Sequence, residues 1–501
     1  MKFKNANLWI ALLIFLVLSQ FVVFGIQREV WFDTAFTQLT IYKMQQGDID
    51  FSQYDVHPPT YYEFAYSWMK IPHAMLDHLW LQELSVVFGL LFLVVAYFAL
   101  KKAFGIHGEY AVIGLAMLSS VLHYGTESRQ YMLVLLLSAV CLLAIVYNWK
   151  WYIVPAGIAV FFLPLTHYFA GMAVFLFVFM YFLYTPKVER DLVRTTVFVA
   201  CGVAGIVTAL FDYALPQLQR ITGTWLPASS VLQWSSSLFH AFFFLPDDAK
   251  ADWFLTTMFV ALIIAILVIL FVGFKWLFGV EVKDRADKLL FGMFLSALFP
   301  LVGLLVLSRV GALYHHRFFL VVTWLFVAAT LVLAGRSWDS WVSRTWPKVK
   351  KASMMFFILV VIVVSWAMLR EYVTTAHHEI TMLADHTPCS SEDVRNWTGT
   401  GRAMFVHNSP FSLHPFEVYR LEHGCSWTNV LSTDVTPLMG HAGGFDVLDP
   451  AQIYWNMTLP EQPVMLYFLA DGSEPFAGME YRVVAASDGA SVLLMTRIGD
   501  R

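Results

Sequence analysis

Long apolar stretches recur along most of this sequence, and they constrain the fold more than any other feature. Eleven of them are long enough, or nearly long enough, to cross a bilayer, for which a helix needs about 20 residues. They are 8–25, 84–100, 110–122, 131–147, 151–165, 168–184, 193–215, 253–274, 289–307, 318–334 and 352–369. The chain is 58% hydrophobic and 14% charged, whereas soluble domains are about 25% charged. We therefore predict a mainly α-helical, polytopic transmembrane bundle of about eleven spans.

Basic residues alternate between the connections of these stretches and so predict the orientation. One side collects Lys2, Lys4, Lys101, Lys102, Lys150, Lys187, Arg190, Arg194, Lys275, Lys283, Arg285, Lys288, Arg336, Arg344, Lys348, Lys350 and Lys351. The positive-inside rule makes this side cytoplasmic, together with the N-terminus. Stretches 110–122 and 151–165 are short enough to be tilted or half-membrane helices. We count both as spans, because leaving out either one would put the later basic residues on the opposite side of the membrane. Stretch 8–25 has no small-residue cleavage site after it and is interpreted as a retained signal anchor.

An odd number of spans leaves the C-terminal region on the extracytoplasmic side. We predict a transmembrane domain over 1–371, with an active-site loop at 27–80, and a small C-terminal α/β domain over 372–501. Strands are expected at 403–406, 464–468, 481–485 and 491–495, the last two flanking a Ser-Asp-Gly turn. Outside the cytoplasm Cys389 and Cys425 could pair, and the sequence alone leaves their pairing open.

Polar residues interrupt the apolar pattern most sharply in the loop 27–80. Asp33 follows the first apolar stretch, and Asp55, His57 and Tyr61 lie in the segment that leads to the next one. Ionisable groups at a membrane boundary are costly unless they face water or a partner. We therefore interpret this segment as part of a functional site, while a solvated loop with incidental acids remains the simpler alternative.

Further polar groups lie in other connections on the same predicted side. Glu127, Arg129 and Tyr131 precede or begin the fourth stretch, His167 separates the fifth from the sixth, and Arg317 enters the tenth. Each of these residues could instead have a purely structural role. Glu127 and Arg129 could pair with each other, His167 could belong to the core, and Arg317 could extend its charge to the membrane surface. Their recurrence on one side favours a shared cavity.

The order of these motifs resembles the type C glycosyltransferases over about residues 8–334. The motifs are Asp33 after the first stretch, then Gly-Asp, HPPTYY, ESRQYML, Thr-His-Tyr and HRFF, in that order. Within these enzymes the sequence is most similar to the branch of protein O-mannosyltransferases and lipid A aminoarabinose transferases. The resemblance implies a membrane helix bundle and a polyprenyl-phosphate-linked sugar donor, with transfer on the outer face. It places the catalytic acid at Asp33, although O-mannosyltransferases often have Asp-Glu where this chain has Asp33-Thr34.

The expected reaction is transfer of a sugar to a protein, lipid or glycan acceptor by single inverting displacement. Asp33 would be the general base, and Arg129 and Arg317 would hold the donor phosphate, because a guanidinium matches phosphate oxygens. Asp55, His57, Tyr61, Glu127, Tyr131 and His167 are expected to bind substrate. Nucleic acid is not an expected partner, since the net charge is only −4.

Three further interpretations remain open from the sequence. Asp55, His57, Glu127, His167, His315 and His316 offer ligands for a divalent metal, but no compact ligand motif such as HExxH is present, so no cofactor is assigned. A transporter or lipid flippase would also have many spans, but it should place ionisable groups at mid-membrane on repeated or broken helices. A non-catalytic scaffold would need fewer spans and no polar cavity.

Overall fold

The computed structural model describes most of the predicted bundle and parts of the C-terminal region. The described residues are 32–47, 57–116, 118–147, 153–185, 192–218, 284–299, 319–345, 389, 403–407, 410–432, 447–448, 464–470, 479–487 and 490–497. The predicted spans 8–25, 253–274 and 352–369 lie outside them. The count of eleven spans therefore stays a prediction.

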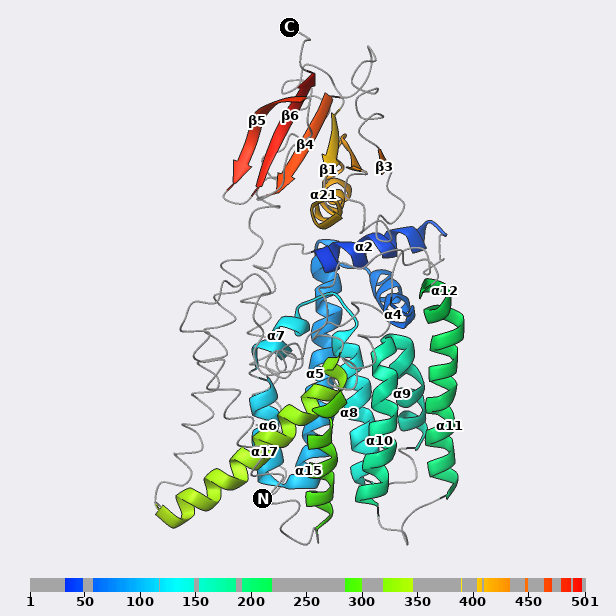
Figure 1. Ribbon diagram of the computed structural model, residues 1–501, viewed down its shortest axis with the longest axis vertical. Coiled ribbons are helices and arrows are strands. Elements are labelled where there is room, and N and C mark those ends of the chain that lie inside the picture. Colours follow the sequence, from blue (N-terminus) through cyan, green and yellow to red (C-terminus); the bar gives the residue numbers. More distant parts are fainter. Residues whose placement is uncertain are drawn as a thin grey trace.

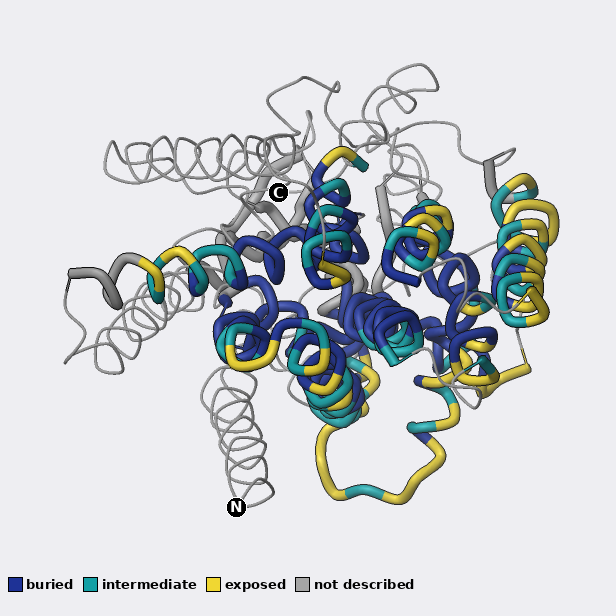
Figure 2. Tube along the Cα trace, turned by 90° about the horizontal axis from the view of Figure 1, so that it is seen from below, coloured by how far each residue is buried: buried dark blue, intermediate teal, exposed yellow. Residues whose placement is uncertain are grey.

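Apolar helices stand side by side and form the membrane part of this multi-pass protein (Figure 1). They are α5 (Asp77–Phe104), α6 (Ile106–Ala116), α8 (Tyr131–Tyr147), α9 (Ile153–Thr166), α10 (Gly171–Tyr184), α11 (Leu192–Thr208), α15 (Arg285–Leu295) and α17 (Leu320–Thr345). Three continuous helical segments, Asp77–Phe104, Leu192–Ala214 and Leu320–Ser340, are long and apolar enough to cross a membrane. Buried residues gather at the centre of the bundle and exposed ones at its periphery (Figure 2).

The predicted spans agree with the helices except where local geometry intervenes. The helix predicted at 131–147 has those bounds. The short stretch 110–122 divides into the end of α6 and a separate short helix, α7 (Ser119–Gly125). The stretch 193–215 begins as α11 and continues as a π-helical turn, η5 (Ala209–Ala214), and α12 (Leu215–Leu218).

Specific side chains hold the centre of the bundle together. The Trp324 indole Nε1 of α17 donates a 2.7 Å hydrogen bond to the Ser138 hydroxyl of α8. The same indole packs edge-to-face on Phe92 of α5, with ring centroids 5.2 Å apart, an arrangement that aromatic quadrupoles favour. Trp324 is 2% exposed, so its hydrogen bond is needed to offset the cost of burying the N–H group. These contacts fix α5, α8 and α17 relative to one another.

Two helices, α2 (Phe32–Gln45) and α4 (Thr60–Met69), lie at one end of the bundle (Figure 1). The predicted active-site loop, 27–80, therefore contains two helices. The reason is burial from two sides: most of α2 is buried, and its Ala35 and Leu39 form a small apolar cluster with Val418 of the C-terminal region. The apolar residues of α2 show little helical periodicity, because both faces of this helix pack against other parts of the protein.

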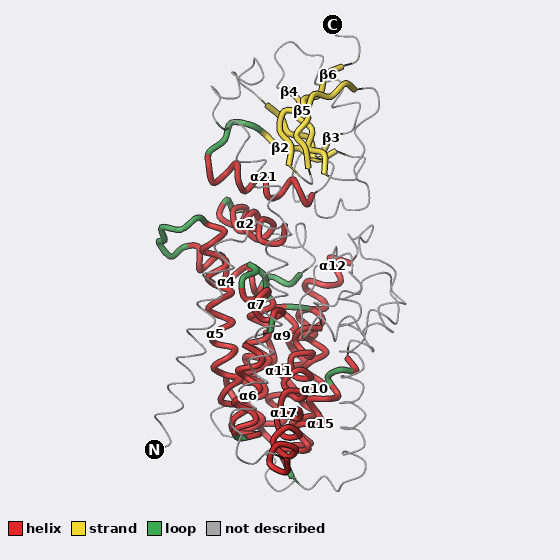
Figure 3. Tube along the Cα trace, turned by 90° about the vertical axis from the view of Figure 1, so that its left-hand side faces the viewer, coloured by secondary structure: helices red, strands yellow, loops and turns green. Residues whose placement is uncertain are grey.

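A six-stranded sheet and helix α21 (Pro410–His423) lie beyond α2 (Figures 1 and 3). The strands, in sheet order, are β3 (Val447–Leu448), β2 (Thr428–Ser432), β1 (Ala403–His407), β4 (Val464–Ala470), β6 (Ala490–Arg497) and β5 (Met479–Ser487). The pairs β1/β2, β1/β4 and β2/β3 are parallel, and β6 is antiparallel to β4 and β5. Strands occur at all four predicted places. Helix α21 connects the parallel strands β1 and β2, as such a crossover requires.

Candidate active site

The Asp33 carboxylate and the Arg129 guanidinium form a buried ion pair where α2 meets the bundle. Asp33 lies in the first turn of α2, where the helix dipole favours a negative charge. Arg129 lies in the loop between α7 and α8, and its Nη2 is 2.6 Å from the Asp33 Oδ1. The side chains are 3% and 5% exposed. A pair this deeply buried is held by its neighbours and costs several kcal/mol to break.

Three neighbours position this pair. The second guanidinium nitrogen, Arg129 Nη1, donates a 2.7 Å hydrogen bond to the Tyr62 hydroxyl of α4. The guanidinium carbon lies 5.4 Å from the centroid of the Phe36 ring of α2, within the range of a cation–π interaction. The Thr37 hydroxyl lies 2.9 Å from the Asp33 carbonyl oxygen and 2.8 Å from that of Ser128. Helices α2 and α4 and the ESRQ segment, residues 127–130, are therefore joined through these contacts.

The remaining residues of the ESRQ segment are anchored to the bundle. The Ser85 hydroxyl of α5 donates a 2.6 Å hydrogen bond to the Glu127 carbonyl oxygen. The Glu127 Oε2 lies 3.4 Å from the His123 Nε2, so the acid two residues before Arg129 has a histidine of α7 as its neighbour. Both side chains are buried. The structure thus gives the side chains of Glu127 and Arg129 separate neighbours, His123 and Asp33.

Histidine and tyrosine rings form a second group at this end of the bundle. The ring centroids of His57 and His167 are 5.5 Å apart, and those of His167 and Tyr131 are 6.3 Å apart. The three residues come from the segment before α4, the end of α9 and the start of α8, and all are buried. Tyr61, also fully buried, packs edge-to-face on Tyr62. Burial raises the pKa of the Tyr61 hydroxyl above its ordinary value, against the lowering effects of Ser85 and Arg129.

Two glutamines that the sequence analysis did not single out carry the most unusual polar groups of this region. Both amide atoms of Gln82 on α5 and of Gln130 beside Arg129 are buried and lack hydrogen-bond partners in the part of the chain that the structure describes. Gln82 lies one turn before Ser85 on α5, on the face toward the ESRQ segment. Buried polar groups without partners are rare and indicate a missing partner such as water or ligand. Their only sequence signal was a polar residue at the edge of an apolar stretch.

Helix α21 contacts this region through a carboxylate. The Glu422 Oε1 accepts a 3.0 Å hydrogen bond from the Gln38 side chain of α2 and lies 2.9 Å from the His78 Nδ1 of α5. Burial raises the pKa of Glu422, but the hydrogen bonds from His78 and Gln38 and the charge of His78 outweigh it, so that the net pKa is lowered. A disulfide bond joins Cys389 to Cys425, just after α21, which answers the question that the sequence left open.

Most predicted site residues gather at this one end of the bundle. Asp33, His57, Tyr61, Glu127, Arg129, Tyr131 and His167 belong to the groups just described, whereas Asp55 and Arg317 lie outside the described residues. Among the described residues, no three or more His, Cys, Asp or Glu side chains are grouped so as to hold a metal ion. His315 and His316 also lie outside that part of the chain. The arrangement offers a carboxylate to accept a proton and a guanidinium to hold an anion.

Comparison with solved structures finds proteins that share the fold over nearly the whole chain. No family model matches the sequence, and a search of curated proteins finds no match. ArnT from Cupriavidus metallidurans bound to undecaprenyl phosphate aligns over 98% of both chains, with a TM-score of 0.63 and 11% identity. Its apo structure gives a TM-score of 0.61 and 12% identity over the same 98% of each chain.

A second relative by fold comes from an archaeon. The apo oligosaccharyltransferase of Archaeoglobus fulgidus aligns with 85% of this chain and 65% of its own, with a TM-score of 0.50 and 12% identity. At these identities the likeness concerns the fold. The resemblance predicted from the motifs is confirmed at that level: the chain has the fold of the type C membrane glycosyltransferases.

Proposed function

We propose that this protein transfers a sugar from a polyprenyl-phosphate-linked donor to an acceptor hydroxyl or amine, with Asp33 as the catalytic base. The single observation that carries the proposal is the buried Asp33–Arg129 pair at one end of an apolar bundle. A fold shared over its full length with a protein that binds undecaprenyl phosphate supports the class of donor. The acceptor class, whether protein, lipid or glycan, is left to the experiment below.

The chemistry follows from the groups present. The Asp33 carboxylate removes the proton of the acceptor, whose heteroatom attacks the anomeric carbon of the sugar. The bond from that carbon to the phosphate oxygen breaks, and the polyprenyl phosphate leaves with the electron pair. A phosphate leaving group needs little protonation, so a single base is sufficient, and the displacement inverts the anomeric carbon. General-base catalysis of this kind contributes about 10²- to 10⁴-fold.

Arg129 has two roles in this proposal. In the ligand-free arrangement its guanidinium neutralises Asp33 at 2.6 Å. A donor phosphate would compete for the same guanidinium, because Arg binds phosphate oxygens in a bidentate fork. When Arg129 turns toward the phosphate, Asp33 loses its cation and becomes the stronger base. Donor binding would thus activate the base, and Tyr62 would hold the guanidinium in either position.

The surrounding residues are proposed to bind the sugar and the acceptor. His57, Tyr61, Tyr131 and His167 supply rings and polar tips, and Glu127 supplies a carboxylate held by His123. Asp55 and Arg317 are kept as substrate-binding residues on their sequence positions. Gln82 and Gln130 are added because their buried amides offer donors and acceptors for sugar hydroxyls. The domain division at 371/372 and an extracytoplasmic site also remain proposals.

Transfer from a panel of radiolabelled polyprenyl-phosphate sugars to membrane extracts tests the proposal. The wild type is compared with Asp33→Asn in detergent, with and without a chelator, which also tests for a metal. Asp287→Asn is the matched control, because Asp287 pairs with Arg336 at 2.9 Å on α15 and α17, away from α2. We expect label transfer by the wild type and the control only. A folded, lipid-binding wild type that transfers no label would instead favour the transporter interpretation.

A further inference from the structure

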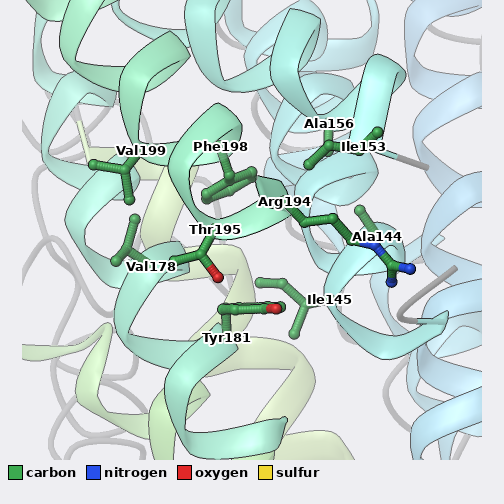
Figure 4. Close-up of a pocket in the computed structure, with 10 residues that line it drawn as sticks. All are labelled: Ala144, Ile145, Ile153, Ala156, Val178, Tyr181, Arg194, Thr195, Phe198 and Val199. Atoms are coloured by element: carbon green, nitrogen blue, oxygen red, sulfur yellow. The ribbon is translucent and has the colours of Figure 1, made fainter. Parts of the chain in front are cut away.

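A half-buried pocket lies between four helices at the end of the bundle away from α2. It is lined by Ala144 and Ile145 of α8, Ile153 and Ala156 of α9, Val178 and Tyr181 of α10, and Arg194, Thr195, Phe198 and Val199 of α11 (Figure 4). Helix α8 begins at Tyr131 in the candidate active site and reaches this pocket at Ala144, 13 residues later. At a rise of 1.5 Å per residue the two sites are about 20 Å apart. The pocket is therefore separate from the Asp33 site.

Side-chain size explains why the helices separate here. Farther along α11, Gly202 and Gly205 allow close approach: a methyl group on Gly202 would collide with Val174, and one on Gly205 with the Phe161 backbone. Toward the start of α11 the same face carries Phe198 and Arg194. Small residues bring membrane helices together and large ones hold them apart. The space between α11 and its neighbours is therefore a consequence of the α11 sequence.

The polar groups of the pocket distinguish it from a simple packing gap. Arg194 places a guanidinium beside Ala144, and the Thr195 hydroxyl points toward Tyr181 (Figure 4). The Tyr181 hydroxyl is buried and has no hydrogen-bond partner among the residues that the structure describes. A second cation, the Lys102 Nζ of α5, lies 5.8 Å from the centroid of the Tyr147 ring, and Tyr147 is one turn after Ala144 on α8. A guanidinium at the end of a membrane helix, beside a buried hydroxyl, is suited to bind an anionic head group.

The neighbouring surface identifies the source of a ligand. Leu192, Val193 and Val197 on α11 are exposed apolar residues beside the pocket, and only 28% of the apolar window of this helix is buried. In a membrane such a surface faces lipid. A molecule that enters from there brings an apolar chain, and the guanidinium and hydroxyl groups select a phosphate. Basic pockets between membrane helices bind acidic lipid head groups on this principle.

We propose that the α8–α11 pocket binds an acidic phospholipid. The lipid phosphate contacts Arg194 and the hydroxyls of Tyr181 and Thr195, and one acyl chain lies against Ile145, Phe198 and Val199. Lys102 adds the second positive charge, which favours an acidic lipid over a zwitterionic one. The bound lipid closes the gap at the start of α11 and holds this helix on the bundle.

Lipid binding to the purified full-length protein tests this proposal without reference to sugar transfer. Phosphatidylglycerol or phosphatidylcholine is added in mixed micelles, and bound lipid is counted by native mass spectrometry while thermal unfolding is followed in parallel. We expect phosphatidylglycerol to bind and raise the unfolding temperature more than phosphatidylcholine does. Arg194→Gln should weaken its binding at least about ten-fold, as loss of a charge-assisted hydrogen bond does.

Two more variants make the outcome decisive. Tyr181→Phe removes only the hydroxyl and should weaken phosphatidylglycerol binding by about two- to ten-fold, which decides the matter if Arg194→Gln does not fold. Arg336→Gln, at a basic residue that does not line the pocket, should bind lipid as the wild type does. Equal binding of both lipids, or unchanged binding by Arg194→Gln and Tyr181→Phe, would overturn the proposal. None of these residues contacts Asp33, so an absence of sugar transfer would leave the result intact.

Discussion

The Asp33 carboxylate meets the Arg129 guanidinium at 2.6 Å, although 96 residues separate them in the sequence. Asp33 comes from a helix at the end of the bundle, and Arg129 from a loop that α5 holds through the bond from the Ser85 hydroxyl to Glu127. The pair can therefore form only when α2, α5 and the ESRQ segment are correctly placed relative to one another. It also places the proposed base and the proposed phosphate ligand in direct contact.

Removing one member of this pair should destabilise the protein strongly. Arg129→Gln leaves the Asp33 charge buried without its cation, and such a loss costs about 3–5 kcal/mol. The double variant Asp33→Asn/Arg129→Gln should cost less than the sum of the single variants, because neither charge remains. Guanidinium unfolding in detergent, followed by tryptophan fluorescence, measures this coupling. The half-buried pair Asp287–Arg336 is the control and should show about 0–1 kcal/mol; equal coupling in both pairs would contradict the prediction.

We expect Gln82 and Gln130 to contribute to substrate binding and not to the stability of the fold. Replacing Gln82 by Met removes two buried polar atoms that lack partners, so the free energy of unfolding should stay unchanged or rise. Transfer from the preferred donor should fall at least about ten-fold, with the loss mainly in KM. Gln38→Met is the comparison, because Gln38 bonds to Tyr42 and Glu422 and its loss should lower stability. A Gln82→Met protein that is less stable yet fully active would refute the assignment.

The contact of α21 with the bundle should weaken in acid. The pKa of Glu422 in the folded protein lies below its ordinary value of 4.5 because of His78 and Gln38, which outweigh its burial. The stabilisation is thus fully present above pH 4.5 and is lost as the pH falls through the lowered pKa. Hydrogen exchange of α2 and α21 at pH 6 and pH 3.5, corrected at each pH for the exchange rate of an unprotected amide, should show the loss as lower protection at pH 3.5. In Glu422→Gln this difference should be absent, and an unchanged difference would assign it to another group.

The disulfide bond should contribute to the stability of the region around α21. Cys389 and Cys425 are separated by 36 residues, and closing a loop of that length stabilises by about 3–4 kcal/mol in the chain-entropy model. Cys425→Ser should therefore lower the unfolding temperature, and a reductant should do the same to the wild type. Cys201→Ser, at a free cysteine, is the control and should keep the response to reductant. A wild type that does not respond to reductant would show that the bond adds no stability.

Hydropathy by itself determined the class of fold and several elements of this protein. The helix at 131–147 has its predicted bounds, because a long apolar run in lipid must satisfy its backbone internally and becomes a helix whatever its neighbours are. The strands at 403–406 and 491–495 were likewise readable from local alternation and turn residues. Asp33 and Arg129 were both identified, since charged residues are rare beside apolar stretches and stand out singly.

Only the tertiary structure decided how these residues are used. The sequence suggested that Glu127 and Arg129 could pair with each other. In the fold, Arg129 pairs with Asp33, and Glu127 lies beside His123. It also makes α2 a helix where a loop was expected, because α21 covers its second face. Hydropathy is a property of a local segment, whereas an ion pair depends on where distant backbones come to lie. The sequence therefore identified the charged residues of the candidate site. The packing of α2, α7 and α8 determined which of them lie in contact.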